Sequence, residues 1–188
     1  MARILVTGGA GYIGSHTVVE LMQQGYEVVI VDNFSNSSAD VLDGIAAIVG
    51  VRPAFEQVDC NDAAAMDAVF TSYPDIVGVI HFAASKAVNE SVVQPLMYYR
   101  NNLMSLITVL QQMKKHKVYN IVFSSSCTVY GQPSAEHLPV DETAPIQKAL
   151  SPYGNTKQIN EEIICDEAHA DAQLRATILR YFNPIGAH

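Results

Sequence analysis

The chain has 188 residues, of which 49% are hydrophobic and 16% are charged, and its formal net charge is −8. This composition fits one globular domain with a sizeable core. Because the few Lys and Arg residues are scattered, the charge pattern argues against nucleic acid or an anionic membrane surface as a partner.

Short apolar runs rich in Val and Ile alternate with longer amphipathic segments along the chain. The runs predict strands at 3–7, 27–31, 54–58, 76–82, 120–125 and 175–180. They are apolar almost throughout, as strands of a parallel sheet are when both faces are buried. The helices expected between them span 12–24, 38–49, 62–72, 95–116 and 152–170. This alternation predicts a three-layer α/β doubly wound parallel sheet, a Rossmann fold, with strand order 3-2-1-4-5-6.

A glycine-rich stretch, TGGAGYIG, joins the first predicted strand to the first predicted helix. Gly8, Gly11 and Gly14 allow a tight turn and a close approach of the backbone to a pyrophosphate. The free N–H groups at the start of the helix favour the same anion. The surrounding strand and helix supply the context that a dinucleotide-binding fingerprint needs.

Asp32 follows the second predicted strand, where a carboxylate can accept a hydrogen bond from an adenosine ribose. A carboxylate there also repels a 2′-phosphate, so the pattern predicts NAD rather than NADP. The alternative is that Asp32 only caps the following loop. Asp59, after the third strand, is a weaker candidate for contact with adenine.

A second set of polar residues comes from SSSCTVYG (124–131) and SPYGNTK (151–157). Ser151-Pro152 has the pattern of a helix start, and Tyr153 and Lys157 are spaced to share one helix face. A free tyrosine has a pKa of about 10, and a neighbouring ammonium lowers it. With a serine, the pair could take a proton from an alcohol while a hydride leaves to NAD⁺. The alternative is an exposed Tyr–Lys pair without a function.

These motifs, together with HFAASKAVNES and RYFNPIGAH, resemble the extended short-chain dehydrogenase/reductase family along the whole chain. Within that family they are similar to the branch that epimerises UDP-hexoses at C4. The resemblance implies that NAD takes hydride from C4 and returns it to the other face of the 4-keto sugar, which interconverts UDP-galactose and UDP-glucose. It also implies that Tyr153 removes the 4-OH proton, that Ser126 holds the sugar oxygen, and that Lys157 binds the nicotinamide ribose and lowers the pKa of Tyr153.

The resemblance also implies a set of binding residues. The expected NAD contacts are Gly8, Gly11, Tyr12, Ile13, Gly14, Asp32, Asn33, Asp59, Cys60, Phe82, Ala83, Ala84, Lys86, Asn101, Ser126, Tyr153, Lys157 and Phe182. The expected contacts to the UDP-sugar are Ser126, Thr128, Tyr153 and Asn183. For Lys86, a solvated loop lysine is the alternative. The family forms homodimers through the outer faces of the helices at 95–116 and 152–170, so we expect a homodimer.

The cysteine and histidine patterns indicate neither a disulfide framework nor a metal site. Three cysteines are an odd number without metal-ligand spacing, which favours a reduced, cytoplasmic protein. Cys127 is expected to be a small packing residue, because nothing around it suggests an activated thiolate.

Two functional alternatives remain. A nucleotide-sugar dehydratase or decarboxylase of the same family carries acidic residues after the serine motif, where this chain has Thr128 and Val129. Family members also continue beyond RYFNPIGAH into a smaller domain that binds UDP. Residues 1–188 are therefore expected to be the NAD-binding domain, and an NAD-binding fragment without turnover is the second alternative. Asn89 stands where the epimerases usually have Gly, which leaves the preference among UDP-sugars open.

Overall fold

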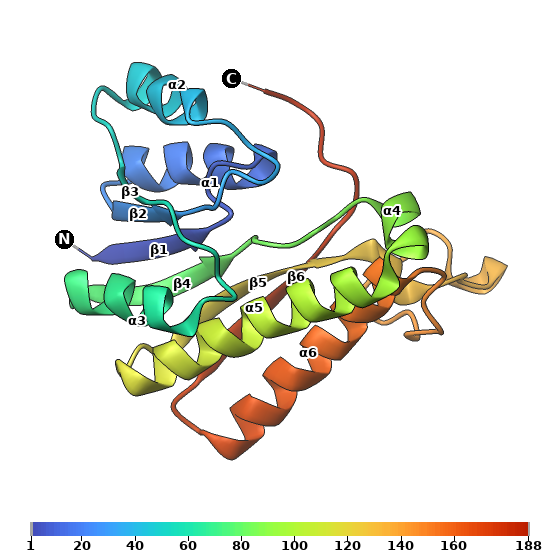
Figure 1. Ribbon diagram of the computed structural model, residues 1–188. Helices are drawn as coiled ribbons and strands as arrows, with labels where there is room; N and C mark the ends of the chain where they lie inside the picture. Colours follow the sequence, from blue (N-terminus) through green and yellow to red (C-terminus); the bar gives the residue numbers. More distant parts are fainter. Residues whose placement is uncertain (1, 188) are drawn as a thin grey trace.

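The computed structural model describes residues 2–187, which form a six-stranded parallel sheet between two layers of helices (Figure 1). The strands are β1 (Arg3–Thr7), β2 (Glu27–Val31), β3 (Ala54–Glu56), β4 (Ile76–His81), β5 (Asn120–Ser126) and β6 (Arg175–Tyr181). Their order in the sheet is β3-β2-β1-β4-β5-β6. The predicted Rossmann-type fold and strand order are confirmed, although the third strand ends at Glu56 rather than at residue 58.

Five long helices cover the two faces of the sheet. They are α1 (Tyr12–Gln23), α2 (Asp40–Val49), α3 (Ala63–Ser72), α5 (Pro95–Lys115) and α6 (Pro152–Ala170). The short helices α4 (Val88–Val93), η1 (Cys127–Tyr130) and η2 (Ala135–His137) were not predicted, since such short segments show little periodicity. No helix within residues 2–187 is long and apolar enough to cross a membrane.

The strands are buried on both sides because successive side chains enter two different apolar clusters. Leu5 and Val29 pack with residues of α3 and α5 on one face. Val6, Val28 and Ile30 pack with residues of α1 and α2 on the other face. This double burial explains why the strand segments read as continuous apolar runs.

The carboxyl ends of the parallel strands lie along one edge of the sheet. β1 and β4 are neighbours in the sheet although other elements separate them in the chain, so the chain leaves them in opposite directions. Ligands of doubly wound sheets bind in the crevice at such a switch point. The predicted site segments after β1, β2, β4, β5 and β6 therefore share this edge. In Figure 1 the C-terminal segment runs from β6 towards α1, and the Tyr12 hydroxyl donates a hydrogen bond to the Gly186 carbonyl.

Candidate functional site

The turn after β1 is packed so tightly that two of its positions accept only glycine. Gly8 has a φ of +68°, and a Cβ there would lie 2.7 Å from the backbone nitrogen of Ala83. A Cβ on Gly14 would lie 2.3 Å from the carbonyl oxygen of Gly8. Gly11 precedes α1 without a side-chain cap, so the first N–H groups of the helix remain available to an anion. This geometry fits the pyrophosphate of a dinucleotide.

The carboxylate of Asp32 connects this turn to the loop after β2. Its Oδ2 accepts a hydrogen bond from the Ala10 N–H at 3.1 Å, and its Oδ1 accepts from the Phe34 N–H and the Ser37 hydroxyl, both at 2.9 Å. Asp32 therefore does cap the following loop, as the alternative interpretation held. A carboxylate has about four acceptor positions, so one remains for a ribose hydroxyl. The two interpretations of Asp32 are compatible.

A chain of polar side chains continues from Asp32 along the edge of the sheet. The Asn33 amide donates to Asp59 at 3.2 Å, and the Asn61 amide donates to Asp59 and to the Asn101 oxygen, both at 2.8 Å. Burial by itself would raise the pKa of Asp59, but the hydrogen bonds from Asn61 and Asn33 outweigh it and lower the pKa. Asp59 and Asn101, both predicted to contact the cofactor, are thus connected through Asn61.

Cys60 differs from its predicted neighbours because its side chain lies in the apolar core under the sheet. Burial raises the pKa of its thiol to about 12, so the thiol is neutral. If Cys60 lines the cofactor site, it does so through its backbone. Cys127 packs against the buried cluster of Val129, Tyr130 and Ala144, in agreement with its expected packing role.

The segment after β4 lies directly beside the glycine turn. The Phe82 N–H donates to the Thr7 carbonyl at 3.0 Å, and Gly8 touches Ala83 as described above. Ala84 follows in the same half-buried stretch, whereas Lys86 is exposed. The geometry suits a cofactor contact by Phe82, Ala83 and Ala84. For Lys86 the cofactor contact stays a prediction.

The start of α6 brings Tyr153 next to the end of β5. Ser151 caps the helix, with its Oγ accepting from the Gly154 N–H at 3.1 Å. A Cβ on Gly154 would lie 3.3 Å from the Cβ of Thr128, so glycine lets the helix approach η1 closely. The Ser126 Oγ accepts from the Thr128 N–H at 3.2 Å and from the Thr128 hydroxyl at 3.0 Å. Tyr153, Ser126 and Thr128 therefore lie close together where the end of β5 meets the start of α6.

Lys157 is almost completely buried, with 3% of its surface exposed. Its Nζ donates to the Ser124 carbonyl at 2.7 Å and lies 4.8 Å from the centroid of the Phe123 ring. The same atom lies 5.9 Å from the centroid of the Tyr153 ring. Tyr153 and Lys157 do share one helix face, and this face is directed into the protein rather than towards solvent.

Burial dominates the electrostatics of this pair. It lowers the pKa of Lys157 to about 8, although the charge of Glu161 acts in the opposite direction. Burial also raises the pKa of Tyr153, against the effect of its hydrogen bond with Ser126. Without a bound cofactor the loss of hydration therefore outweighs the hydrogen bond from Ser126. The lowering of the Tyr153 pKa by Lys157 and NAD⁺ stays a prediction.

His81, at the end of β4, adds a neutral ring beneath the site. Burial lowers its pKa to about 3, and the Lys157 charge acts in the same direction. Its Nδ1 lies 2.7 Å from the Thr7 hydroxyl, and its ring stacks on Phe123 with centroids 6.1 Å apart. Lys157 thus faces a neutral imidazole rather than a second cation.

The remaining predicted residues lie at the exposed rim. Tyr12 at the start of α1, and Phe182 and Asn183 after β6, are exposed, and Ile13 is half-buried. No contact in the described residues joins Asn183 to Ser126 or Thr128. Their common role in binding a UDP-sugar therefore stays a prediction.

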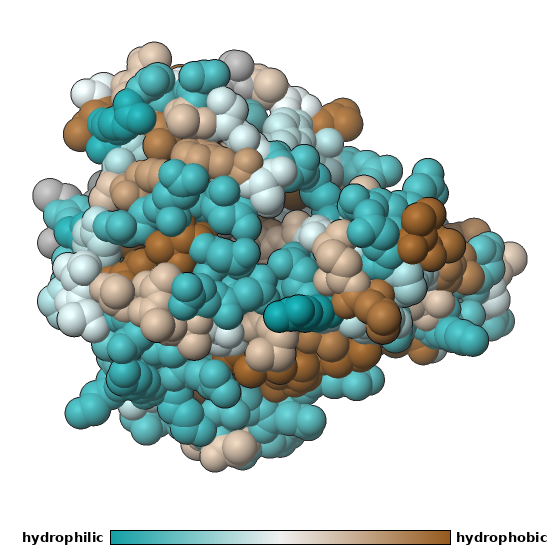
Figure 2. All heavy atoms as spheres, viewed as in Figure 1, coloured by the Kyte–Doolittle hydropathy of each residue, from teal (hydrophilic) through white to brown (hydrophobic). Residues whose placement is uncertain are grey.

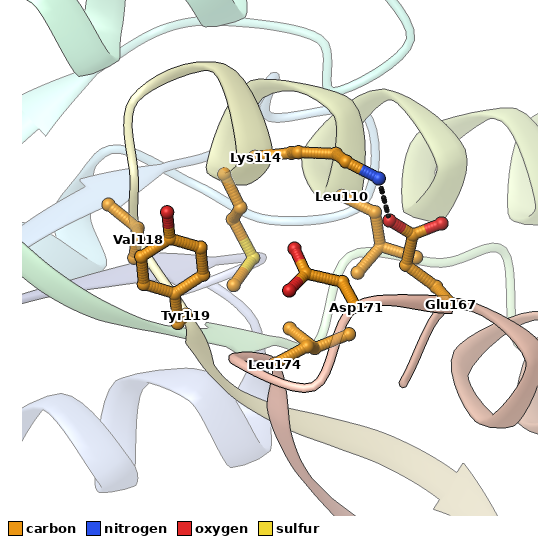
Figure 3. Close-up of a pocket in the computed structure, with 8 residues that line it drawn as sticks. Leu110, Lys114, Val118, Tyr119, Glu167, Asp171 and Leu174 are labelled. Carbon is orange, nitrogen blue, oxygen red and sulfur yellow. Dashed lines mark hydrogen bonds and ion pairs between the residues drawn. The ribbon is translucent and has the colours of Figure 1, made fainter. Parts of the chain in front are cut away.

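A small cavity elsewhere on the protein is unrelated to this set of residues. It holds about 10 Å³ and lies between the C-terminal ends of α5 and α6 (Figure 3). Apolar side chains, including Leu110 and Leu174, line it beside the ion pair of Lys114 and Glu167, whose charged atoms are 2.7 Å apart. Tyr153 stands at the opposite end of α6.

The comparison with known proteins agrees with the geometry of the site. The sequence matches the profile of the NAD dependent epimerase/dehydratase family over residues 4–188. The chain belongs to this family. The resemblance identified from the motifs is thereby confirmed.

Two curated members of the epimerase/dehydratase family and one crystal structure show how far the similarity extends. UDP-glucose 4-epimerase uge1 of Schizosaccharomyces pombe is 50% identical over 187 residues, and UDP-glucose 4-epimerase of Bacillus subtilis is 51% identical over 185 residues. The structure of UDP-glucose 4-epimerase from Bifidobacterium longum in complex with NAD⁺ and UDP gives a TM-score of 0.96 at 46% identity and covers 100% of this chain. The chain spans about half the length of these proteins, namely 52%, 53% and 55%.

Two residues beside the site, Glu161 and Arg180, were not predicted from the sequence. The buried Glu161 and the half-buried Arg180 form an ion pair behind Lys157, in contact with Ser125 and Tyr130. The spacing of four residues between Lys157 and Glu161 was an available signal for a shared helix face. The pairing of Glu161 with Arg180 left no signal in the sequence, because it depends on how β6 packs beside α6.

The glycine turn leads to a test by substitution. We expect Gly14→Ala to weaken the binding of NAD⁺ at least tenfold, because the added methyl group would lie 2.3 Å from a backbone oxygen and displace the turn. Isothermal titration with NAD⁺ measures this. Gly44→Ala is the matched control: it lies in α2 with nothing within 4 Å of the new Cβ. It should leave binding unchanged and stabilise the fold by up to about 1 kcal/mol. Unchanged NAD⁺ affinity in Gly14→Ala would contradict the assigned cradle.

Proposed function

We propose that this chain carries the NAD-binding and acid–base part of an enzyme that interconverts UDP-galactose and UDP-glucose by epimerisation at C4. The observation that carries the proposal is that Tyr153, Lys157 and Ser126 converge at the carboxyl edge of the sheet, the edge that also carries the glycine turn. The relatives named UDP-glucose 4-epimerase support it.

The cofactor in this proposal is NAD. The turn at Gly8 and Gly14 would hold its pyrophosphate, and Asp32 would bind the adenosine ribose through the remaining acceptor position. Bound NAD⁺ supplies the hydride acceptor and donor, so the reaction needs no net oxidation or reduction. The solved relative from Bifidobacterium longum, which contains NAD⁺ and UDP, supports this choice.

The proton of the sugar 4-OH would pass to Tyr153. The Ser126 oxygen accepts two hydrogen bonds from Thr128, so its own hydrogen is directed to another acceptor. Its hydrogen bond with Tyr153 acts to lower the pKa of the phenol, which assists the transfer. A sugar oxygen placed between Ser126 and Tyr153 would be held by the first and deprotonated by the second.

Lys157 would complete the set by holding a ribose and stabilising the phenolate. One of its three N–H donors goes to the Ser124 carbonyl, which leaves two for ribose hydroxyls. With a pKa of about 8, the side chain is mostly protonated at pH 7. Its positive charge therefore favours the ionised form of Tyr153 at neutral pH and disappears in mild alkali.

The related dehydratase and decarboxylase reactions are disfavoured by the residues after Ser126. Thr128 donates its hydroxyl to Ser126, and Val129 is completely buried in an apolar cluster. Neither residue can supply the additional carboxylic acid that these reactions use. The other alternative, an NAD-binding fragment without turnover, is an outcome of the test below.

We further propose that the protein forms a cytoplasmic homodimer through α5 and α6. Leu106 and Leu110 of α5 are buried in the core, so they cannot serve an interface. Other apolar side chains are exposed on and beside α5, at Val92, Val93, Leu96, Met97 and Met104. Figure 2 shows brown hydrophobic spheres gathered in the region of α4, α5 and α6. An interface there would remove these side chains from water.

The dimer is tested by sedimentation velocity. Met104→Glu should shift the protein from dimer to monomer, because the charge would be placed within the interface. Ile48→Glu is the control, since Ile48 and Met104 are equally exposed at 45% but Ile48 lies on α2, on the other face of the sheet. A monomeric wild-type protein, or a dimer unaffected by Met104→Glu, would refute this interface.

The reaction is tested by incubating the protein with UDP-galactose and separating the UDP-sugars by chromatography. We expect UDP-glucose to form, and we expect the supernatant of heat-denatured protein to contain NAD⁺ or NADH. Nucleotide without conversion would identify an NAD-binding unit that has no turnover. The absence of both would overturn the proposal.

Tyr153→Phe tests the assignment of the base. The variant should lose at least about a hundredfold in turnover, since the proton acceptor is removed, while it keeps bound NAD. Tyr119→Phe removes a hydroxyl at the far end of the α5–α6 pair and should not change the rate. Near-normal turnover in Tyr153→Phe would exclude the proposed mechanism.

A further inference from the structure

An ion pair between the buried Glu161 and the half-buried Arg180 lies behind the face of α6 that carries Tyr153 and Lys157. Glu161 follows Lys157 by one helical turn and is only 6% exposed. Its Oε1 accepts from Arg180 Nε at 3.1 Å, and its Oε2 accepts from Arg180 Nη2 at 2.8 Å. The Ser125 hydroxyl donates to the same carboxylate. A bidentate contact of this kind holds both side chains in a fixed relative orientation.

Arg180 extends this contact to the loop that follows the serines. Its Nη1 donates to the Tyr130 hydroxyl at 3.0 Å, and its guanidinium carbon lies 4.9 Å from the centroid of the Tyr130 ring. The ion pair therefore links β5, η1, α6 and β6. Ser125 adjoins Ser126, and Tyr130 follows Thr128 by two residues, so this contact fixes the backbone that carries the proposed proton-transfer groups.

The charge of Glu161 acts on Lys157 in particular. The side chains around the ammonium are Tyr153 on the same helix, neutral His81 on β4 and the Phe123 ring on β5. Glu161 supplies the negative charge that opposes the effect of burial on the pKa of Lys157. Arg180 instead compensates the cost of burying the carboxylate.

We propose that Glu161 and Arg180 are positioning residues that keep Lys157 protonated and Ser126 in place for the acid–base step. The proposal rests on the proposed function, in which a charged Lys157 supports the phenolate of Tyr153. Glu161 acts through charge, and Arg180 acts by holding Glu161 and Tyr130. Without the carboxylate, Lys157 would lose its proton at a lower pH.

The decisive experiment measures the titration of Lys157 itself. The chain has six lysines, so NMR of protein labelled with ¹³C at the lysine ε-carbon gives few signals, and Lys157→Met assigns the one of interest. In Glu161→Gln we expect the midpoint of the Lys157 titration to fall by about one pH unit or more. Glu167→Gln, the same substitution on the same helix at the exposed pair with Lys114, should not move it. An unchanged titration in Glu161→Gln would overturn the proposal.

A second variant covers the case in which Glu161→Gln does not fold. Glu161→Gln/Arg180→Gln replaces the ion pair with two neutral amides, so it leaves no buried charge unpaired. Because the carboxylate is again absent, the Lys157 titration should move in the same direction. A Lys157 titration at its wild-type pH in this folded double variant would equally overturn the proposal.

The pH dependence of UDP-galactose turnover separates a charge effect from a general loss of structure. We expect Glu161→Gln to turn over several-fold more slowly than wild type at pH 8 but at a similar rate at pH 6.5, where Lys157 is still protonated. An equal loss at both pH values would show a merely structural role and refute the charge effect. If no protein form turns over, the NMR titration still decides the role of Glu161, and only the proposed function fails.

Discussion

The arrangement of the site depends on one constraint, the burial of the Lys157 ammonium. A cation inside a protein is costly unless its surroundings replace the water it loses. Here a backbone carbonyl of β5, the face of Phe123 and the charge of Glu161 take that role. The compensation is partial, because the pKa of Lys157 is still lowered to about 8. The side chain is thus charged at neutral pH and close to losing its proton.

The neighbours of Lys157 follow from the same constraint. His81 is buried and neutral, so it adds no second positive charge beside the ammonium. Glu161 is itself buried, and a carboxylate at that depth needs its own counter-ion, which Arg180 provides. The ion pair thus neutralises the carboxylate that faces the buried lysine. Its contacts to Ser125 and Tyr130 then order the strand end and the loop at the site.

The sheet topology brings the cofactor side of the site to these groups. The change of direction between β1 and β4 opens the crevice, and Gly8 touches Ala83 across it. The two backbone segments are so close there that a side chain at Gly8 would collide with Ala83. The proposed acid–base residues come from β5 and α6, on the β4 side of this crevice, whereas the proposed phosphate cradle comes from β1 and α1. The two halves of the chemistry meet only because parallel strands end at one edge.

The sequence alone determined the features that depend on local spacing. The apolar runs, the glycine pattern, the cap at Ser151 and the Tyr153–Lys157 spacing correctly predicted the fold, the tight turn and the start of α6. Each of these follows from residues that are close in the chain, where backbone geometry leaves few choices.

Only the tertiary structure decided the electrostatics. Burial, which no local pattern measures, opposes the lowering of the Tyr153 pKa that its neighbours in sequence predict. The ion pair of Glu161 with Arg180 joins residues 19 positions apart, and it exists because β6 pairs with β5 where both strands pack against α6. The loss of hydration and the contacts between distant elements arise when the chain folds, so spacing along the sequence could not reveal them.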